Sequence, residues 1–287
     1  EGYTHSILNS ERGKPLSGWG SLTGKGVGKK LDELKPDAVL LTGFNYRYDG
    51  VACLAAMRRG IPVWLRCENQ DHAVVRSRKK ALVRSLIYRV AYRFINKAFY
   101  IGKLNKSHYL KHGISEANLF PAHYATVDRF ASMSRAEKQD MRQQQRKKTG
   151  GNRENLVVGF SGKFISKKNP DLLFQMLDHL DKKLRSRIFL YFLGSGEREV
   201  ILRKLAADVL SKYGVKTYFA GFANQSELAS HYLAMDLLVL PSRLMGETWG
   251  LVANESMQAG CSVIVSSAVG SGADFGSWER FRVANEG

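Results

Sequence analysis

Residues 237–255 have the sequence LLVLPSRLMGETWGLVANE, in which an apolar run leads through a glycine-containing loop into a helical pattern. The run at 237–240 predicts a buried β-strand, and the pattern from Gly250 predicts an α-helix. Glu247 and Glu255 stand eight positions apart across this junction. Because open α/β sheets bind ligands at the carboxyl ends of their strands, the stretch predicts a ligand site in such a sheet.

The C-terminal half of the chain continues this alternation of short apolar runs and helical patterns. Apolar strands that alternate with helices are typical of parallel sheets covered on both faces. Strands are predicted at 156–160, 188–193, 215–220, 236–240 and 262–265, and helices at 170–183, 197–212, from 226, and at 250–259.

The N-terminal half repeats the alternation less regularly, and a polar, highly charged segment separates the two halves. Strands are predicted at 38–41, 62–65 and 98–101, and helices at 51–59 and 76–97. The predicted fold class is α/β, with two Rossmann-like doubly wound parallel-sheet domains. The domains are expected at 1–130 and 155–287, joined by a charged linker at 131–154.

The chain of 287 residues carries 44 Lys and Arg against 26 Asp and Glu, a formal net charge of +18. This charge favours anionic partners, which include nucleotides, nucleic acid and acidic lipid headgroups. Cys53, Cys67 and Cys261 have neither metal-ligand nor disulfide spacing, so we expect structural thiols and a cytoplasmic protein. No run is long and apolar enough to span a bilayer.

The segment 76–97 combines an apolar stripe with many basic residues and contains no acid. The stripe repeats at helical spacing as Leu82/Val83, Leu86/Ile87, Val90/Ala91 and Phe94/Ile95. We expect this stripe to pack on the N-terminal sheet. The alternative is that the helix lies on an anionic membrane, which would make the protein peripheral at the cytoplasmic membrane face.

Lys163 and Lys168 flank the predicted turn between the strand at 156–160 and the helix at 170–183. A helix N-terminus with two cations can bind a diphosphate, because backbone N–H groups and ammonium groups point at the same anion. A solvated basic loop is the alternative. Gly194-Ser195-Gly196 follows the next strand in the same way, and Phe222 follows the third; Phe222 could cover a base, but a core position is more frequent.

Glu247 and Glu255 would lie roughly 12 Å apart if both were helical. This separation argues against two carboxylates that share a proton and favours carboxylates that hold the two ends of an extended ligand. The alternative is a pair of exposed helix-surface acids.

These residues together resemble the donor-binding domain of family 4 glycosyltransferases, which are retaining enzymes with the GT-B fold. The resemblance covers nearly all of residues 156–275 and is specific because several motifs occur in order. The matching elements are Gly162-Lys163 with Lys168, Gly194-Ser195-Gly196, Pro241-Ser242, Glu247-x7-Glu255, and Ser266 to Gly270 with Asp274.

The resemblance implies roles for individual residues. Lys163, where the family commonly has Arg, and Lys168 would neutralise the donor diphosphate; with Glu247, which would contact the transferred sugar, they form the expected catalytic set. Glu255 would bind the ribose hydroxyls. The expected donor-binding residues are Gly162, Gly194, Ser195, Phe222, Gly246, Thr248, Trp249, Gly250, Leu251 and Glu255. We expect no metal and no resident cofactor, because the lysines and the helix dipole would stabilise the leaving nucleoside diphosphate.

The N-terminal half is similar to the acceptor domains of these enzymes, with Asn45, Arg66, Glu68 and His72 as candidates by their location after strands. The two domains would face a cleft, and both would be incomplete, so we expect a fragment that lacks both ends of the family pattern. Activity of such a fragment on its own is left open.

The predicted function is transfer of a sugar from a nucleotide-diphosphate sugar to an acceptor hydroxyl with retention, in glycan, polysaccharide or glycolipid biosynthesis. The acceptor would be a glycan or a lipid-linked molecule. The alternatives are a basic nucleic-acid-binding module, which the net charge permits, and a non-catalytic scaffold of the same fold.

Overall fold

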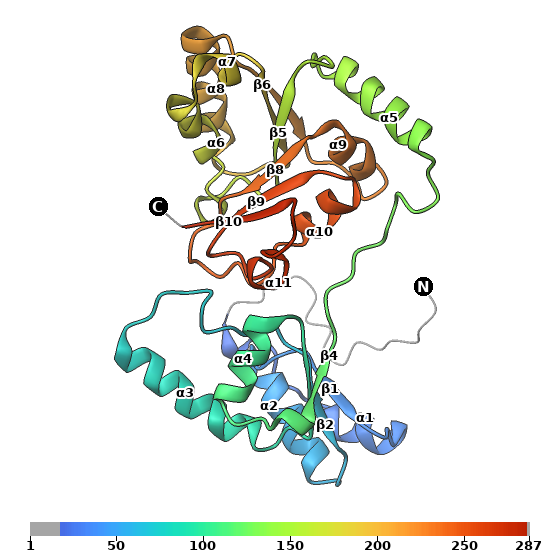
Figure 1. Cartoon of the computed structure of the whole chain (residues 1–287). Coiled ribbons are helices and arrows are strands. Elements are labelled where there is room, and N and C mark those ends of the chain that lie inside the picture. Colours follow the sequence, from blue (N-terminus) through green and yellow to red (C-terminus); the bar gives the residue numbers. More distant parts are fainter. Residues whose placement is uncertain (1–17, 286–287) are drawn as a thin grey trace. The chain divides into compact units, whose positions relative to one another are not determined.

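The computed structural model describes residues 18–285, which divide into two compact units (Figure 1). The first unit consists of residues 18–71 and 76–123. The second consists of residues 124–285 together with the short segment 72–75. Each unit has its own parallel sheet and its own hydrophobic core.

The first unit contains a four-stranded parallel sheet in the order β1-β2-β3-β4. The strands are β1 (Val39–Leu41), β2 (Val63–Leu65), β3 (Lys97–Tyr100) and β4 (Leu119–Pro121). The helices are η1 (Trp19–Ser21), α1 (Val27–Leu34), α2 (Arg47–Met57), α3 (Arg78–Tyr92), α4 (Lys103–Lys111) and η2 (Glu116–Asn118).

The second unit contains a six-stranded parallel sheet in the order β10-β9-β8-β5-β6-β7. The strands are β5 (Leu156–Ser161), β6 (Ile188–Leu193), β7 (Lys216–Gly221), β8 (Leu237–Leu240), β9 (Ser262–Ser266) and β10 (Phe281–Ala284). The helices are α5 (Arg135–Lys148), η3 (Ser166–Lys168), α6 (Leu172–Gln175), η4 (Met176–His179), α7 (Lys182–Arg185), α8 (Glu199–Tyr213), α9 (Leu228–Ala234), α10 (Leu251–Gln258) and α11 (Gly272–Phe275).

The second sheet is covered on both faces, as the unbroken apolar runs of its central strands predict. All six residues of β6 are buried. Helices α6 and α8 pack together on one side, while α9 contacts α5 and α10 on the other (Figure 1). Gly159 in β5 leaves room for Met235, because a Cβ there would lie 2.2 Å from the Met235 sulfur. The two-domain α/β prediction is therefore confirmed.

The predicted helix at 170–183 is wrong in its length. The segment forms α6, η4 and α7, each of four residues. Leu180 is extended, and the carboxylate of Asp181 accepts a hydrogen bond from the Leu184 N–H at 2.8 Å, which starts a new helix. The side chain of Asp181 thus competes with helix continuation, as short acidic residues do at caps.

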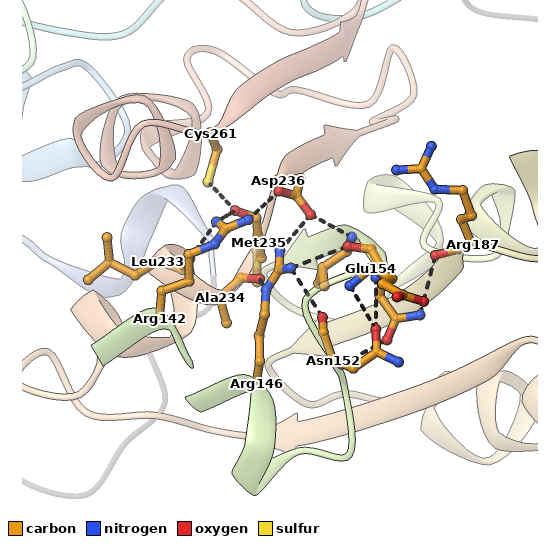
Figure 2. Close-up of polar contacts among 12 residues, drawn as sticks. Arg142, Arg146, Asn152, Glu154, Arg187, Leu233, Ala234, Met235, Asp236 and Cys261 are labelled. Carbon is orange, nitrogen blue, oxygen red and sulfur yellow. Dashed lines mark hydrogen bonds and ion pairs between the residues drawn. The ribbon is translucent and has the colours of Figure 1, made fainter. Parts of the chain in front are cut away.

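The expected connector at 131–154 is also revised, because α5 lies within the second unit and packs on α9. Arg142 and Arg146 reach from α5 to Asp236, directly before β8 (Figure 2). Arg146 donates to Asp236 at 2.5 Å and to the carbonyl of Ala234 at 2.8 Å. Two of the basic residues in the predicted linker, Arg142 and Arg146, therefore attach α5 to the second unit.

The predicted apolar stripe of 76–97 packs on the first unit only at its end, where Ala91 and Ile95 contact the core. The helix turns Tyr88 and Tyr92 toward the unit, while Leu82, Leu86 and Ile87 are exposed. The buried face of α3 is mainly aromatic, so over most of the helix the hydrophobic periodicity points to the wrong side.

Asp236 organises the amino edge of the second sheet. It accepts hydrogen bonds from Arg142 and Arg146 (Figure 2). It also accepts one from the backbone N–H of Val157 at the start of β5. Burial opposes its charged form, but these donors hold the pKa of Asp236 below its usual value. One carboxylate thus links α5, β5 and β8.

We predict that Asp236→Ala lowers the free energy of unfolding by roughly 2–4 kcal/mol, because it leaves two partly buried arginines without their carboxylate. Since the folded-state pKa is lowered, this contribution is complete above the unfolded-state pKa and is lost as the pH falls through the folded-state value. Urea titrations from pH 7 to pH 3 measure both effects.

The matched control is Glu199→Ala, which removes an exposed pair with Arg203 within α8. It should cost about 0.5 kcal/mol or less. Equal losses for the two variants at pH 7 would contradict a special role for Asp236.

Candidate functional site

The loops that follow the strands of the second sheet meet at its carboxyl edge. The N–H of Gly162, after β5, donates to the carbonyl of Leu193 at the end of β6 at 2.9 Å. The N–H of Arg243, after β8, donates to the carbonyl of Lys167 at 2.8 Å. Backbone contacts therefore fix three of these loops against one another.

Two glycines allow the loops after β5 and β6 to approach. A Cβ on Gly194 would lie 2.0 Å from the carbonyl oxygen of Gly162, and one on Gly196 would lie 2.6 Å from that of Phe164. Both glycines also have positive φ angles, 132° and 159°. The Gly194-Ser195-Gly196 motif is thus required by close backbone packing, and it leaves Ser195 exposed at this edge.

Glu247 lies in the loop after β8, with its side chain largely buried. Its Oε2 is 2.5 Å from Nζ of Lys168 and accepts a hydrogen bond from Oγ of Ser242 at 3.3 Å. The structure therefore brings together Lys168 and Glu247, two predicted site residues that are far apart in sequence. A carboxylate and an ammonium group in contact can together bind a ligand that carries hydroxyls and phosphates.

Glu247 and Glu255 do not lie on one helix, contrary to the prediction from their spacing. Helix α10 begins at Leu251, so Glu247 precedes it and only Glu255 is helical. The rise of an eight-residue helix does not apply to this pair. The alternative of two exposed helix-surface acids is likewise wrong for Glu247, which is 7% exposed.

The two lysines of the loop after β5 differ in environment. Lys163 is exposed, whereas Lys168 is at the end of the short 3-10 turn η3. The α-helix that follows, α6, has only four residues, so its dipole is much weaker than the predicted helix at 170–183 would provide. Anion binding at this loop would therefore depend on the side-chain charges of the lysines.

Lys167 is a residue that the sequence did not single out. Its ammonium group donates to the carbonyl of Gly246 at 2.8 Å and so joins the loop after β5 to the loop that carries Glu247. Gly246 itself has a φ of 98°. In the sequence Lys167 is simply a lysine next to Lys168, and its residue type does not distinguish it from Lys163 or Lys168.

The loop enters α10 through Gly250, whose φ is 90°. A Cβ there would lie 2.8 Å from Leu240 Cδ2 and 2.9 Å from Val269 Cγ1, so glycine is needed for packing. The Trp249 side chain is buried and donates from Nε1 to Asn254, at 3.0 Å. Trp249 can therefore contribute to a ligand only through its backbone.

Thr248 and Leu251 flank this entry, half-buried and exposed respectively. Both belong to the stretch whose backbone N–H groups are expected to meet the donor phosphates.

Glu255 on α10 accepts a hydrogen bond from the Tyr232 hydroxyl at 2.6 Å. Burial and the Glu255 charge raise the pKa of Tyr232 well above its usual value, so the phenol stays protonated as the donor. Glu255 also lines a cavity of about 190 Å³ with Leu251 and Gln258. The carboxylate is thus oriented by a fixed donor and borders an open volume.

Phe222 is 80% exposed, so the core position favoured for it is wrong. It directly follows β7, at the carboxyl edge of the sheet, where Gly221 has a φ of 73°. An exposed aromatic ring at this edge is compatible with stacking on a base, which stays a prediction.

The acceptor candidates divide between the two units. Asn45, Arg66 and Glu68 belong to the first unit, where they follow β1 and β2. His72 belongs to the second unit, and its Nε2 lies 2.5 Å from the carbonyl oxygen of Ser267. The sequence places His72 with the other three only because it is near them in the chain.

A cluster of Asp71, His108 and His112 in the first unit has the composition of a metal site. Its carboxylate, however, already contacts Arg84 at 2.6 Å and Lys111 at 2.9 Å. Burial lowers the pKa of His108 to about 4, which favours a neutral imidazole beside the carboxylate. Two cations on Asp71 oppose a further divalent cation, so the cluster serves to link α3 and α4 to the segment after β2.

Comparison with known proteins adds to this geometry. Residues 141–275 match the family model of the glycosyl transferases group 1. The chain is 28% identical over 237 residues to the D-inositol 3-phosphate glycosyltransferase of Streptomyces bingchenggensis. This match covers 77% of the chain and 50% of the relative, so the chain spans about half the length of that protein.

Solved structures show the same fold. The Anabaena HepE structure in complex with UDP has a TM-score of 0.67 at 14% identity, covering 91% of this chain and 68% of that one. WaaG, a glycosyltransferase involved in lipopolysaccharide biosynthesis, has a TM-score of 0.57 at 19% identity, covering 91% and 67%. Residues 141–275 are therefore similar in sequence to the group 1 glycosyl transferases, and the chain shares the GT-B fold of these solved structures.

Proposed function

We propose that the protein transfers a sugar from a nucleotide-diphosphate sugar to an acceptor hydroxyl, with retention of anomeric configuration. The observation that carries the proposal is the contact between Lys168 and Glu247 at 2.5 Å, at the edge where the strands of the second sheet end. Complexes of Anabaena HepE with UDP and with UDP-glucose support a uridine nucleotide as the first donor to test.

The donor site in this proposal uses residues of the second unit. Lys163 and Lys168 neutralise the diphosphate as it leaves, and the backbone of 248–251 supplies N–H donors to it. Glu247 contacts the transferred sugar, and Glu255 accepts hydrogen bonds from the ribose hydroxyls. Glu247 compensates the charge of Lys168, and a bound diphosphate would compete for that ammonium group.

The donor chemistry in this proposal requires neither a metal nor a resident cofactor, because cationic side chains stabilise the leaving group. The acceptor is a glycan or a lipid-linked molecule, used in glycan, polysaccharide or glycolipid biosynthesis. Asn45, Arg66 and Glu68 are the candidates for contacting it. A cytoplasmic location, peripheral at the membrane face, is part of the proposal and is supported by three buried free cysteines.

We predict that the double variant Lys163→Gln, Lys168→Gln weakens UDP binding by about 10- to 100-fold, because charged hydrogen bonds to the diphosphate are lost. Uridine, which lacks the phosphates, should bind both proteins equally. Titration calorimetry with UDP, GDP, ADP and uridine measures this difference.

The control is Lys182→Gln, Lys183→Gln, an exposed pair on α7 whose removal lowers the net charge equally. An equal loss of UDP affinity in the control variant would show that the effect comes from the net charge of the protein and not from Lys163 and Lys168. Tight oligonucleotide binding with a steep salt dependence, together with no nucleoside diphosphate affinity, would favour the nucleic-acid alternative.

We predict that Glu255→Gln weakens binding of UDP and of uridine alike, by about tenfold, because a neutral amide accepts weaker hydrogen bonds from the ribose. The amide can still accept the Tyr232 hydroxyl, so the fold is preserved. Deoxyuridine diphosphate should bind the wild type and the variant with more similar affinities. An unchanged preference for the ribonucleotide in Glu255→Gln would contradict the assignment to the ribose.

We predict that Glu247→Gln lowers kcat for sugar transfer by at least about tenfold and does not weaken UDP binding, because it frees the Lys168 ammonium group for the diphosphate. The carboxylate is assigned to the sugar, whose charge develops only during transfer. Initial rates with a radiolabelled UDP-sugar, compared with calorimetric UDP affinity, separate the two effects. Loss of UDP affinity with unchanged kcat would reverse the assignment.

A further inference from the structure

We propose that a groove along α5, at the amino edge of the second sheet, binds a small molecule that carries several phosphate groups. This site goes beyond the proposed function, because Asp236 and the groove precede β8 whereas the donor residues follow it. The α5 groove is defined by its basic lining residues, which are Arg135, Lys138, Arg142, Arg146, Lys147 and Arg153.

The α5 groove is a concave site with a volume of about 750 Å³. Helix α5 forms one wall, and Leu233 in α9 and Ala259 at the end of α10 line the other. A volume of this size is typical of sites that hold small molecules. The shape of the groove therefore favours a compact ligand over the surface of another protein.

One face of α5 supplies most of the charge. The α5 residues that line the groove follow the three- and four-residue spacing of a single helix face: Arg135, Lys138, Gln139, Arg142, Gln143, Arg146 and Lys147. The two acids of α5 are not among them. Glu137 accepts a hydrogen bond from the Ser134 N–H at 2.7 Å, and Asp140 accepts one from Gln144 at 2.7 Å. Of the described residues that line the groove, none is acidic.

Two of the cations are fixed in position. Arg142 donates to the carbonyl of Leu233 at 2.9 Å, and Arg146 donates to the carbonyl of Ala234 at 2.8 Å (Figure 2). Both arginines also pair with Asp236 (Figure 2). One carboxylate thus serves two guanidinium groups, and this wall of the groove keeps a positive charge. Burial and the neighbouring Arg142 charge lower the pKa of Arg146, so a further anion would stabilise its charged form.

The other cations can turn toward a ligand. Within residues 18–285, Arg135, Lys138 and Lys147 take part in no ion pair, and Lys138 is half-buried beside the fixed arginines. Arg153 donates to the amide oxygen of Gln143 across the groove. Phosphate suits this arrangement, because each group offers three strong acceptor oxygens to ammonium and guanidinium donors that converge from several directions.

The lining also distinguishes a small phosphorylated molecule from a nucleic-acid strand. Single-stranded nucleic acid is bound where aromatic side chains stack on successive bases beside a basic groove. The described residues around the α5 groove include no aromatic side chain. The groove therefore offers contacts for phosphate groups but no platform for bases.

The test is titration calorimetry with inorganic tripolyphosphate on the 287-residue chain that carries Lys163→Gln and Lys168→Gln. This background removes the proposed donor lysines, so the result does not depend on the donor site. Tripolyphosphate should bind at least about tenfold more tightly than orthophosphate, and less tightly as salt is raised. Addition of Lys138→Gln and Lys147→Gln to this background should weaken tripolyphosphate binding by about tenfold or more, because two charged contacts are lost.

A matched control adds Lys182→Gln and Lys183→Gln, an exposed pair on α7, to the same background. It removes an equal charge and should bind tripolyphosphate within about twofold of the background chain. In the otherwise wild-type chain, Lys138→Gln with Lys147→Gln should leave UDP affinity within about twofold. A defect of the α5 groove is thereby distinguished from a defect of the donor site and from unfolding.

Three results would overturn the inference. Tripolyphosphate that does not bind the background chain, or binds no more tightly than orthophosphate, would leave the groove without a polyphosphate ligand. Equal weakening by the α7 control would assign the binding to net charge. A short single-stranded oligonucleotide that binds more tightly than tripolyphosphate, and loses affinity with Lys138→Gln and Lys147→Gln, would assign the groove to nucleic acid.

Discussion

Parallel pairing of the six strands of the second sheet is the constraint on which the rest of the site depends. Because β5, β6, β8 and β9 all run in one direction, the loops after them meet at one edge. Lys168 and Glu247 are far apart in the chain but lie 2.5 Å apart in space, because both follow strands that end at this edge. An antiparallel neighbour in the middle of the sheet would send one of these loops to the opposite edge.

At the opposite, amino edge of the sheet, ion pairs join α5 to the strands. Asp236 accepts hydrogen bonds from Arg142 and Arg146 (Figure 2) and from the backbone N–H of Val157 at the start of β5. The high positive charge of the chain therefore has distinct uses. Some basic side chains pack α5 against the sheet, and Lys168 contacts Glu247 at the carboxyl edge. Others surround an exposed apolar row on α3, so net charge alone could not distinguish these environments.

The sequence predicted elements well where strands are fully buried and poorly where short segments depend on local caps. The second sheet appears within a residue or two of its predicted strands, apart from β10, because unbroken apolar runs have little alternative to a central strand. The helix predicted at 170–183 failed because Asp181 caps a new turn. A side chain that competes for backbone N–H groups outweighs weak helix propensity over such short segments.

At the candidate site, the sequence predicted the residues but not their geometry. The types and order of Lys168, Glu247 and Glu255 could be found from the sequence, because loops after apolar strands carry ligand contacts. Their geometry could not, since Glu247 precedes α10 and the role of Lys167 in bridging two loops depends on a carbonyl. The exposure of Phe222 was equally hidden, because an aromatic residue after a strand packs in or out according to its neighbours.

By itself the sequence determined the fold class, the two-part organisation and the residues of the family 4-like motif, because these follow from hydrophobic periodicity and from motifs in a fixed order. The tertiary structure decided which side of each element meets the core. On α3 the hydrophobic stripe suggested burial, yet tyrosines and a buried histidine network occupy the packed face. Hydrophobic periodicity indicates that a helix has an apolar face and a polar face. Only packing against the rest of the unit determines which of these faces is covered.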